Sequence, residues 1–437
     1  MKLKFQSPTG MHDILDEDQR YFQKIYDVIN DIVGFYNFKK IETPILEETE
    51  LFSKGIGLKT EVVQKQMFSL RTRGRDYLTL RPEGTAPVVR AYIQNGMQSF
   101  PKPVKLWYFG PFFRYEKPQM GRFRQFWQFG LEIIGEESSA RDTEIIQIFY
   151  SILKKLKLKD LIIEVNSIGD SSCRPYYKKL LVSYLKSRVI GLCVSCRRRL
   201  KENPLGILDC KEEKCQRIIS QAPQIIDHLC QNCHQHFKEV LESLDEIEIP
   251  YRLNPYLVRG LDYYTRTVFE IFSPLTEKKE SSEKQEKTPE TIKHAFAGGG
   301  RYDGLVKILG GKDTPAVGAA GGIDRIIWLM KKKAIRFPRK TKPQIFLAQL
   351  GSLAKRKTFK LIEEFRKAEI PVLESLSRDS LRAQLAIADR SGVDYTLILG
   401  QKEALGGTII IRHMATGKQK EVKLEKVIKE MKKALKR

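Results

Sequence analysis

The stretch from Leu106 to Gly135 constrains the fold of this 437-residue chain more than any other. Two aromatic, apolar runs flank a basic middle that contains glycine, which predicts two antiparallel strands joined by a long loop. In the second run Gln128 and Glu132 are spaced so that they share one face of a strand, about 13 Å apart along it. Arg114 and Glu116 are predicted to share a face of the first strand in the same way.

Charged groups beside aromatic side chains need partners, because burying them unpaired costs free energy. A ligand that carries both positive and negative groups would supply those partners. A sheet with one solvent-exposed face explains the same pattern without any ligand, so the hairpin alone leaves both interpretations open.

The polar positions of the hairpin follow a known order. Arg114-x-Glu116, a loop, and Phe126 before a Gln-x-x-x-Glu strand together resemble motif 2 of the class II aminoacyl-tRNA synthetases. The string RYEKPQMGRFRQFWQFGLE is similar to the form found in histidyl-tRNA synthetases. The resemblance implies that Arg114 holds the α-phosphate of ATP, that Glu116 contacts ATP and that Phe126 stacks on adenine. It assigns three residues of the loop to the acceptor end of tRNA: Gln119, Arg122 and Arg124.

The segment before the hairpin fits the same resemblance. Residues 17–37 carry apolar side chains at helical spacing, and 39–46 form an extended segment with a proline, which is typical of a sheet edge or an interface. A helix followed by such a strand resembles motif 1, the dimer-forming element of class II synthetases. The resemblance implies a homodimer.

Residues 77–91 predict a strand, a tight turn and a helix. On the turn, Glu83 and Thr85 place a carboxylate and a hydroxyl two residues apart, where they could jointly hold an ammonium group. The alternative is that Thr85 only caps the helix. In the resembled family this Pro-Glu-Gly-Thr element binds the amino group of histidine, which assigns Glu83, Gly84, Thr85 and, from the hairpin, Gln128 to that end of the amino acid.

Residues 255–272 predict a strand with an unusual number of polar side chains. The run RGLDYYTRTVFE is similar to the histidine-specific motif of the family. The resemblance implies that Arg259 is the catalytic cation of the activation step and that, with Arg114, it holds the α-phosphate and the histidine carboxylate. Glu132 and Tyr264 would read the imidazole, with Tyr263 beside them. A structural arginine–aspartate pair is the alternative.

Two glycine-rich segments follow. GGGRYDGL, residues 298–305, resembles the second histidine-specific element, and its glycines permit close backbone approach to a ligand. Residues 316–327 predict a strand, a glycine turn and a helix with Arg325 in its first turn, where the helix dipole favours anions. This matches motif 3, whose arginine holds the γ-phosphate of ATP; the alternative is a surface arginine at a helix end.

Net charge suggests a polyanionic partner. Lysine and arginine number 77 against 53 aspartates and glutamates, a net charge of +24. Nucleic acid is the expected partner, although a general bias toward lysine would give the same excess. The resemblance implies a tRNA for histidine, with L-histidine and ATP as the small substrates and Mg²⁺ entering on the phosphates.

Residues 169–249 are helix-prone and basic and contain all seven cysteines. Two CxxC pairs make zinc a candidate, but the gap between the pairs exceeds that of compact zinc modules. The resembled family does not require a metal here, so we assign no metal ligand and expect buried thiols. In that family an insertion near the tRNA acceptor stem occupies this place. The cysteines in question are Cys193, Cys196, Cys210, Cys215, Cys230 and Cys233.

Residues 276–293 are dense in charge and low in apolar residues, and predict a mobile loop at a hairpin tip. Beyond a basic linker, strands alternate with helices, which predicts a small α/β domain with a mixed sheet. This part resembles the anticodon-binding domain of several class II synthetases.

Taken together, the patterns and the resemblance predict an α/β fold: a class II antiparallel sheet flanked by helices, a helical insertion and a C-terminal α/β domain. The predicted bounds are 1–168 and 250–333 for the catalytic core, 169–249 for the insertion and 343–437 for the anticodon-binding domain. The implied reaction activates L-histidine with ATP to histidyl-adenylate and transfers histidine to the 3′ end of its tRNA.

Two other functions fit a similar fold. One is the synthetase-like regulatory subunit of ATP phosphoribosyltransferase, which lacks the C-terminal domain and tends to lose the catalytic arginines; the other is an RNA-binding protein built on a synthetase scaffold. Arg114, Arg259 and Arg325 are all present here, which favours the enzyme. The N-terminus has no apolar run and no later run approaches a membrane span, so we expect a cytoplasmic protein without a membrane segment.

Overall fold

The computed structural model describes residues 5–118, 121–276, 291–337 and 343–435. The chain divides into two compact units, residues 1–337 and 338–437. This division lies between the segments predicted as catalytic core and as anticodon-binding domain. Each unit is described by itself below.

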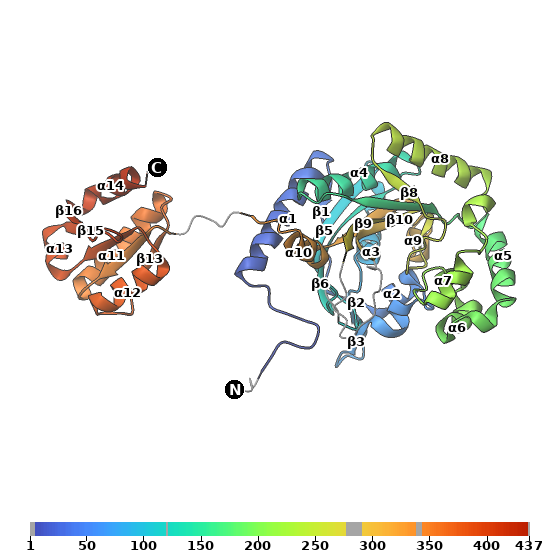
Figure 1. Ribbon diagram of the computed structural model, residues 1–437, viewed down its shortest axis with the longest axis horizontal. Coiled ribbons are helices and arrows are strands. Elements are labelled where there is room, and N and C mark those ends of the chain that lie inside the picture. The colour runs from blue at the N-terminus through green and yellow to red at the C-terminus, as the bar shows by residue number, and fades with distance from the viewer. Residues whose placement is uncertain (1–4, 119–120, 277–290, 338–342, 436–437) are drawn as a thin grey trace, which may run out of the picture. The chain divides into compact units, whose positions relative to one another are not determined.

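The large unit is built on an eight-stranded sheet with strand order β1-β5-β6-β11-β10-β9-β7-β8 (Figure 1). Neighbouring strands are antiparallel except at the two ends, where β1 pairs with β5 and β7 with β8 in parallel. The strands are β1 (Lys39–Lys40), β5 (Val104–Phe113), β6 (Gln125–Ile134), β7 (Ile162–Ser167), β8 (Tyr251–Leu253), β9 (Thr265–Thr276), β10 (Thr291–Arg301) and β11 (Ala316–Gly322). A smaller antiparallel sheet consists of β2 (Leu46–Glu48), β3 (Phe68–Arg71) and β4 (Tyr77–Leu80).

The alternation of side chains along β6 separates a helix-covered face from a polar face. Phe129, Leu131 and Ile133 are fully buried and belong to a core that also contains residues of four helices. Those helices are α1 (Asp16–Phe35), α4 (Ala140–Lys155), α8 (Gln231–Glu246) and α10 (Ile323–Lys332). Gln128 and Glu132 therefore face the other way, as their spacing predicted.

The polar face of the sheet is bounded by a second core. Apolar residues of α3 (Thr85–Gln94) pack there with Tyr108 of β5 and with the helices between β7 and β8. The helix-prone character of 169–249 is seen as four helices, grouped on one side of the unit in Figure 1. Besides α8 they are α5 (Arg174–Lys186), α6 (Val194–Glu202) and α7 (Glu213–Ile219); short helices elsewhere in the unit are α2 (Thr49–Ile56) and α9 (Leu305–Ile308).

Two strand predictions were too long. β5 ends at Phe113, so Arg114 and Glu116 lie beyond it, where the chain turns and the Glu116 amide donates to the Arg114 carbonyl at 2.8 Å. The strand expected over 255–272 begins only at Thr265. The preceding residues are held as a loop, because the Asn166 side-chain amide donates to the Leu257 carbonyl at 2.9 Å and occupies a backbone group that a ladder would need.

The small unit contains a mixed sheet of order β13-β12-β14-β15-β16 with helices around it. Its core consists of buried apolar residues from all these layers, such as Phe365, Leu397 and Met431. The α/β prediction is confirmed here, apart from the short helix α13, which was not anticipated. The elements are β12 (Ile345–Gln349), α11 (Ser352–Lys367), β13 (Val372–Glu374), α12 (Leu381–Ser391), β14 (Tyr395–Leu399), α13 (Gln401–Gly406), β15 (Thr408–His413), β16 (Gln419–Lys423) and α14 (Val427–Ala434).

Some predictions fall outside the described residues. Gln119, assigned to the tRNA end, is one of them, and so are residues 277–290 of the predicted mobile loop. On either side of that segment β9 and β10 pair as far as Thr276 and Thr291. Among the helices that the structure describes, none is both long and apolar enough to cross a membrane.

Candidate active site

Glu132 lies at the centre of the polar face and is fully buried. Its carboxylate accepts a hydrogen bond from the Thr85 hydroxyl at 2.8 Å and another from the Tyr302 hydroxyl at 2.6 Å. Burial, opposed by these hydrogen bonds, raises the pKa of Glu132 from 4.5 to about 8, and the nearby Glu83 adds to the rise. A buried carboxyl group held by two hydroxyls can accept a hydrogen bond from a ligand that carries an N–H group.

The raised pKa of Glu132 predicts a pH-dependent stability. Between its unfolded pKa of 4.5 and its folded pKa of about 8, the native state holds a proton that the unfolded state has lost. The contribution of this proton to the free energy of unfolding is therefore fully present below the unfolded pKa, falls by about 1.4 kcal/mol per pH unit as the pH rises, and levels off above the folded pKa.

We expect this pH dependence in the difference in free energy of unfolding between the native chain and Glu132→Gln, measured by urea unfolding without histidine. Tryptophan fluorescence reports the large unit alone, because Trp107, Trp127 and Trp328 all lie in it. A difference that does not change with pH would contradict the raised pKa.

Glu83 and Thr85 lie on the turn before α3. The sequence suggested Thr85 as the cap of this helix, but Glu83 caps it instead. The Glu83 carboxylate accepts hydrogen bonds from the backbone N–H groups of Thr85 at 2.8 Å and Ala86 at 2.9 Å. It thereby gives partners to two N–H groups at the start of the helix. Thr85 does not cap the helix, because its hydroxyl donates to Glu132 instead. The turn thus connects a buried carboxylate, Glu83, with the hydroxyl that orients Glu132.

Tyr263 and Tyr264 close the site from the loop before β9, and both are buried. Their ring centroids are 4.6 Å apart, and the Tyr263 hydroxyl donates to Glu83 at 3.3 Å. Tyr302 lies against them, 5.7 Å from the ring of Tyr263. Tyr302 was not among the predicted site residues; the signal was its place in the GGGRYDGL element, which was interpreted through its glycines only.

Glycines allow these groups to lie flat against the sheet. A Cβ on Gly318, the cross-strand neighbour of Glu132, would stand 1.7 Å from a carboxylate oxygen of Glu132. The ring of Tyr108 lies over Gly130 and Gly84, where an added Cβ would meet it at 2.2 and 2.3 Å. A side chain at any of these three positions would displace the polar group or ring that covers it.

Arg259 lies beside Tyr264 and forms an ion pair with Glu270 of β9. Its guanidinium carbon is 5.9 Å from the centroid of the Tyr264 ring. It also covers Gly298, whose added Cβ would stand 2.7 Å from a guanidinium nitrogen. Glu270, which holds the arginine in this place, was not predicted; the signal was its place at the end of the RGLDYYTRTVFE run, in which only the arginine and the tyrosines were assigned roles.

A cluster of charged residues lies near Glu270, the ion-pair partner of Arg259. Arg325, in the first turn of α10 as predicted, donates to the Ala295 carbonyl at 2.7 Å. Burial, together with the charges of Arg122 and Arg114, lowers its pKa to about 10, while Glu116 and Glu270 oppose the shift. Three arginines within each other's field favour binding of an anion with several charges, because it would offset their repulsion.

Arg114 and Glu116, although past the strand, still lie together. Their side chains are 3.9 Å apart, and Arg122 approaches the same carboxylate at 3.8 Å. The Arg114 guanidinium donates to the Pro82 carbonyl at 2.8 Å and lies 5.6 Å from the ring of Phe126. Arg114 is therefore the member of the arginine cluster that contacts the turn before α3.

The remaining predicted residues differ in their surroundings. Gln128 lies on the polar face between two glycines, Gly110 of β5 and Gly322 of β11, and is partly buried. Arg124 stacks on Tyr115 at 3.9 Å and donates to the Glu116 carbonyl at 3.3 Å. Its assignment to tRNA stays a prediction.

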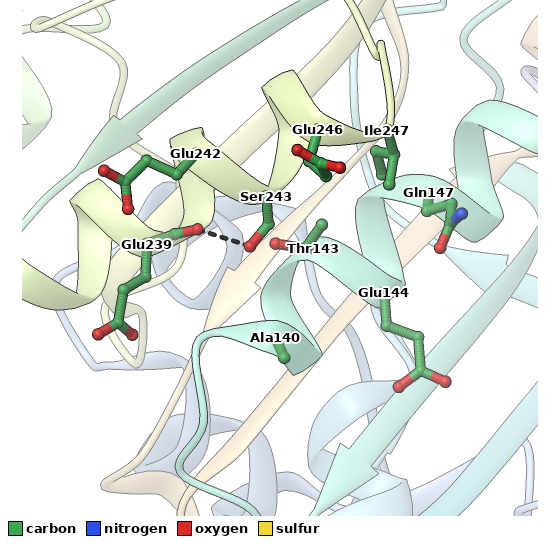
Figure 2. A pocket seen from close by; sticks show the side chains of 9 residues that line it. All are labelled: Ala140, Thr143, Glu144, Gln147, Glu239, Glu242, Ser243, Glu246 and Ile247. Carbon is green, nitrogen blue, oxygen red and sulfur yellow. Dashed lines mark hydrogen bonds between the residues drawn. The ribbon is translucent and has the colours of Figure 1, made fainter.

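One cavity of the large unit lies away from all these residues. Figure 2 shows it between α4 and α8, lined by four glutamates with Ser243 and Gln147, and its volume is about 420 Å³. The Ser243 hydroxyl is turned toward its own helix and donates to the Glu239 carbonyl at 2.7 Å. Such an acidic lining is unsuited to phosphate, so this cavity does not compete with the arginine cluster as a nucleotide site.

Family comparisons agree with this geometry. Residues 10–326 match the family described as Histidyl-tRNA synthetase, and residues 344–434 match the family described as Anticodon binding domain. The histidine--tRNA ligase of Dehalococcoides mccartyi is 42% identical over 431 residues, which cover 99% of this chain and 100% of that protein. That of Halothermothrix orenii is 43% identical over 429 residues, with 98% and 99% covered.

A solved structure shows the same fold. The apo crystal structure of S. aureus histidyl-tRNA synthetase is 32% identical in sequence, with a TM-score of 0.77 and coverage of 98% of this chain and 99% of that one. The predicted fold class is confirmed by this match, both in the antiparallel-rich sheet flanked by helices and in the C-terminal unit. This chain therefore belongs to the histidyl-tRNA synthetase family.

Proposed function

We propose that the chain activates L-histidine with ATP to histidyl-adenylate and transfers the histidyl group to the 3′ end of histidine tRNA. The observation that carries the proposal is a continuous series of contacts across the polar face. It runs from the carboxyl–hydroxyl group around Glu132, through Glu83 and the paired tyrosines, to Arg259 and its ion-pair partner Glu270, whose charge also acts on Arg325. One end suits a small ring with N–H groups, and the other suits a polyphosphate.

The histidine would lie at the acidic end. Glu132 and Tyr264 bind the imidazole, with Tyr263 and Tyr302 beside them, because an acceptor and a hydroxyl suit a ring that both donates and accepts. Glu83 and Gln128, with Gly84 and Thr85 of the turn, hold the α-amino group. The buried carboxyl group of Glu83 retains lone pairs besides those that accept its two backbone amides, so it has capacity for an ammonium group.

ATP would lie over the arginine cluster. Arg114 and Arg259 hold the α-phosphate and the histidine carboxylate between them, and Arg325 holds the γ-phosphate. Phe126 stacks on adenine, and Glu116 contacts the nucleotide. Arg122, with 42% of its side chain exposed beside Glu116, would meet the acceptor end of tRNA.

Catalysis in this site would depend on positioning and positive charge. A carboxylate oxygen of histidine attacks the α-phosphorus, and the bond to pyrophosphate breaks. The terminal hydroxyl of the tRNA then attacks the carbonyl carbon, and AMP leaves. Arg259 stabilises the charge that develops on the α-phosphate, and its ion pair with Glu270 fixes it there before substrates bind.

Magnesium fits this site as a companion of ATP. Two carboxylates, Glu116 and Glu270, lie among the arginines and offer the oxygen ligands that Mg²⁺ prefers. Both already pair with arginines, so the ion would arrive on the phosphates and keep most of its water. When bound it would neutralise phosphate charge.

A homodimer is proposed through the edge of the large sheet. β1 is the terminal strand, and the motif 1 resemblance falls on it and the helix before it. A cavity of about 610 Å³ lies along this edge. It is lined by β1, the start of β5 and apolar residues such as Met97 and Phe100.

We place the protein in the cytoplasm, where tRNA is charged for translation.

The regulatory-subunit alternative is separated from the enzyme by one assay. We expect labelled pyrophosphate to exchange into ATP when histidine is present. No exchange is expected when any other amino acid replaces histidine. Histidine binding measured by calorimetry without exchange would overturn the proposal and support a histidine sensor. Exchange without charging of histidine tRNA would overturn the second half of it.

A further inference from the structure

All seven cysteines of the chain lie between residues 173 and 233, and the structure sorts them into two groups. Cys193, Cys196, Cys210 and Cys215 form one group, and Cys173, Cys230 and Cys233 join Asp170 in the other. Within each group the ligand atoms all lie within 4.8 Å of one another. The two CxxC pairs therefore do not share one site, which is why their spacing in the sequence did not match a single zinc module.

The first cysteines of the two CxxC pairs have the same backbone conformation. Cys193 precedes α6 with φ −68° and ψ 162°, and Cys230 precedes α8 with φ −67° and ψ 161°. In each, the first cysteine is the residue before the helix and the second lies in its first turn, which brings both sulfurs to the helix start. The repetition of one turn at two distant places in the chain argues for one shared chemical task.

The four-cysteine group has the dimensions of a tetrahedral thiolate site. A zinc ion with Zn–S bonds of about 2.3 Å requires sulfurs about 3.8 Å apart. The sulfurs of Cys193 and Cys210 are 3.9 Å apart. Backbone N–H groups donate to two of the sulfurs, from Cys196 to Cys193 at 3.4 Å and from Cys193 to Cys215 at 3.2 Å. Such donors stabilise thiolates and orient them as ligands.

The second group joins two parts of the insertion. Cys173 stands before α5, and its sulfur lies 3.6 Å from a carboxylate oxygen of Asp170 and accepts the Asp170 backbone N–H at 3.3 Å. Cys230 and Cys233 come from the start of α8. The preceding Gly169 has φ +63°, and a Cβ there would stand 2.5 Å from the Cys173 sulfur, so the backbone leaves room for that sulfur to enter the group.

The part of the insertion that carries the four-cysteine group consists of short helices. α6 has nine residues and α7 seven, and turns connect them. Small modules of this kind commonly need a metal or disulfides in addition to their apolar core. The segment also supports the histidine end of the site, because the Asn203 side-chain amide donates to Asp262 at 3.1 Å and Arg174 donates to the Tyr264 carbonyl.

We propose that the insertion binds two structural zinc ions, one at Cys193, Cys196, Cys210 and Cys215, the other at Asp170, Cys173, Cys230 and Cys233. In each site the protein supplies all four ligands, which leaves no open position for catalysis. The metal joins the starts of helices that the sequence separates. It thereby fixes the surface against which the loop of Tyr263 and Tyr264 rests.

The test is the metal content of the full chain, expressed with zinc and purified without chelator or a metal-affinity step. Two zinc ions per chain are expected for the native chain, one each for Cys196→Ser and Cys233→Ser, and none for the double variant. The controls Ser195→Ala and Asn232→Ala change exposed residues inside the same two CxxC turns and should keep both ions. Cobalt substitution should give thiolate-to-cobalt charge-transfer absorption that falls stepwise through the same series.

Several results would overturn the proposal. These are a native chain free of zinc, a zinc content that neither cysteine substitution lowers, bound iron in place of zinc, or a mass and thiol titration that show disulfides. If the serine variants do not fold, the test is made on the native chain alone. Modification of its thiols should release two zinc ions per chain. Release of no zinc would contradict both sites. Neither readout depends on aminoacylation.

Discussion

Replacing Arg259 by histidine is expected to lower histidine-dependent pyrophosphate exchange by about 10³-fold, with little change in the KM for ATP. The guanidinium lies next to the ring of Tyr264 and is held by Glu270, between the acidic end of the site and the arginine cluster. Histidine is shorter and largely uncharged at neutral pH, so charge on the α-phosphate in the transition state would lose its partner. Exchange kinetics with varied histidine and ATP measure the effect.

Two controls separate this loss from damage to the site. Arg252→His makes the same replacement at an exposed position of β8 and should leave exchange unchanged. The double variant Arg259→His with Glu270→Gln removes the carboxylate that the first substitution leaves without its ion-pair partner. If the double variant recovers exchange, the arginine acts mainly by neutralising Glu270, and its assignment as the catalytic cation is wrong.

Replacing Glu132 by glutamine is expected to raise the KM for histidine by about 100-fold, because the amide has one oxygen to accept hydrogen bonds from Thr85, Tyr302 and the imidazole, where the carboxyl group has two. The volume of the side chain is kept, and the hydroxyls of Thr85 and Tyr302 retain a partner in the amide. The KM for ATP should not change. Selectivity for histidine over isosteres without ring nitrogens should fall in parallel, measured as ratios of kcat/KM in exchange.

The matched control for this substitution is Glu246→Gln, an exposed change in the cavity of Figure 2. It should alter neither constant. A Glu132→Gln variant with unchanged KM and selectivity would mean that the imidazole is read by other groups. The pH dependence of unfolding would then still report the burial of Glu132, because that measurement needs no substrate.

The sequence predicted those parts of the site that lie on regular elements. Alternation along β6 placed Gln128 and Glu132 on one face, and the glycine-to-helix transition placed Arg325 in the first turn of α10, because period and helix position are local properties. The roles of Arg114 and Arg259 came from resemblance, and the strands predicted around them were too long. Their positions depend on turns held by distant groups, such as the amide of Asn166.

Other features could not be predicted because they exist only between distant segments. The hydrogen bond from Tyr302 to Glu132 joins residues 170 positions apart, and no local pattern marks it. The grouping of cysteines is of the same kind, since Cys173 and Cys233 meet only after α5 to α8 have folded. The capping of α3 by Glu83 was missed for a different reason: a glutamate before a helix is less typical as a cap than the threonine that follows it.

The glycines of the polar face have a consequence for the adaptability of this protein. A glycine usually leaves room for a larger residue. At Gly318, however, any Cβ would collide with Glu132, and at Gly84 and Gly130 it would collide with Tyr108. Single substitutions at these positions can only fill space that the chain already uses. A search for variants that accept a larger amino acid would therefore succeed sooner at Tyr263 and Tyr264, which close the site and from which atoms can be removed, than at the glycines, where atoms can only be added.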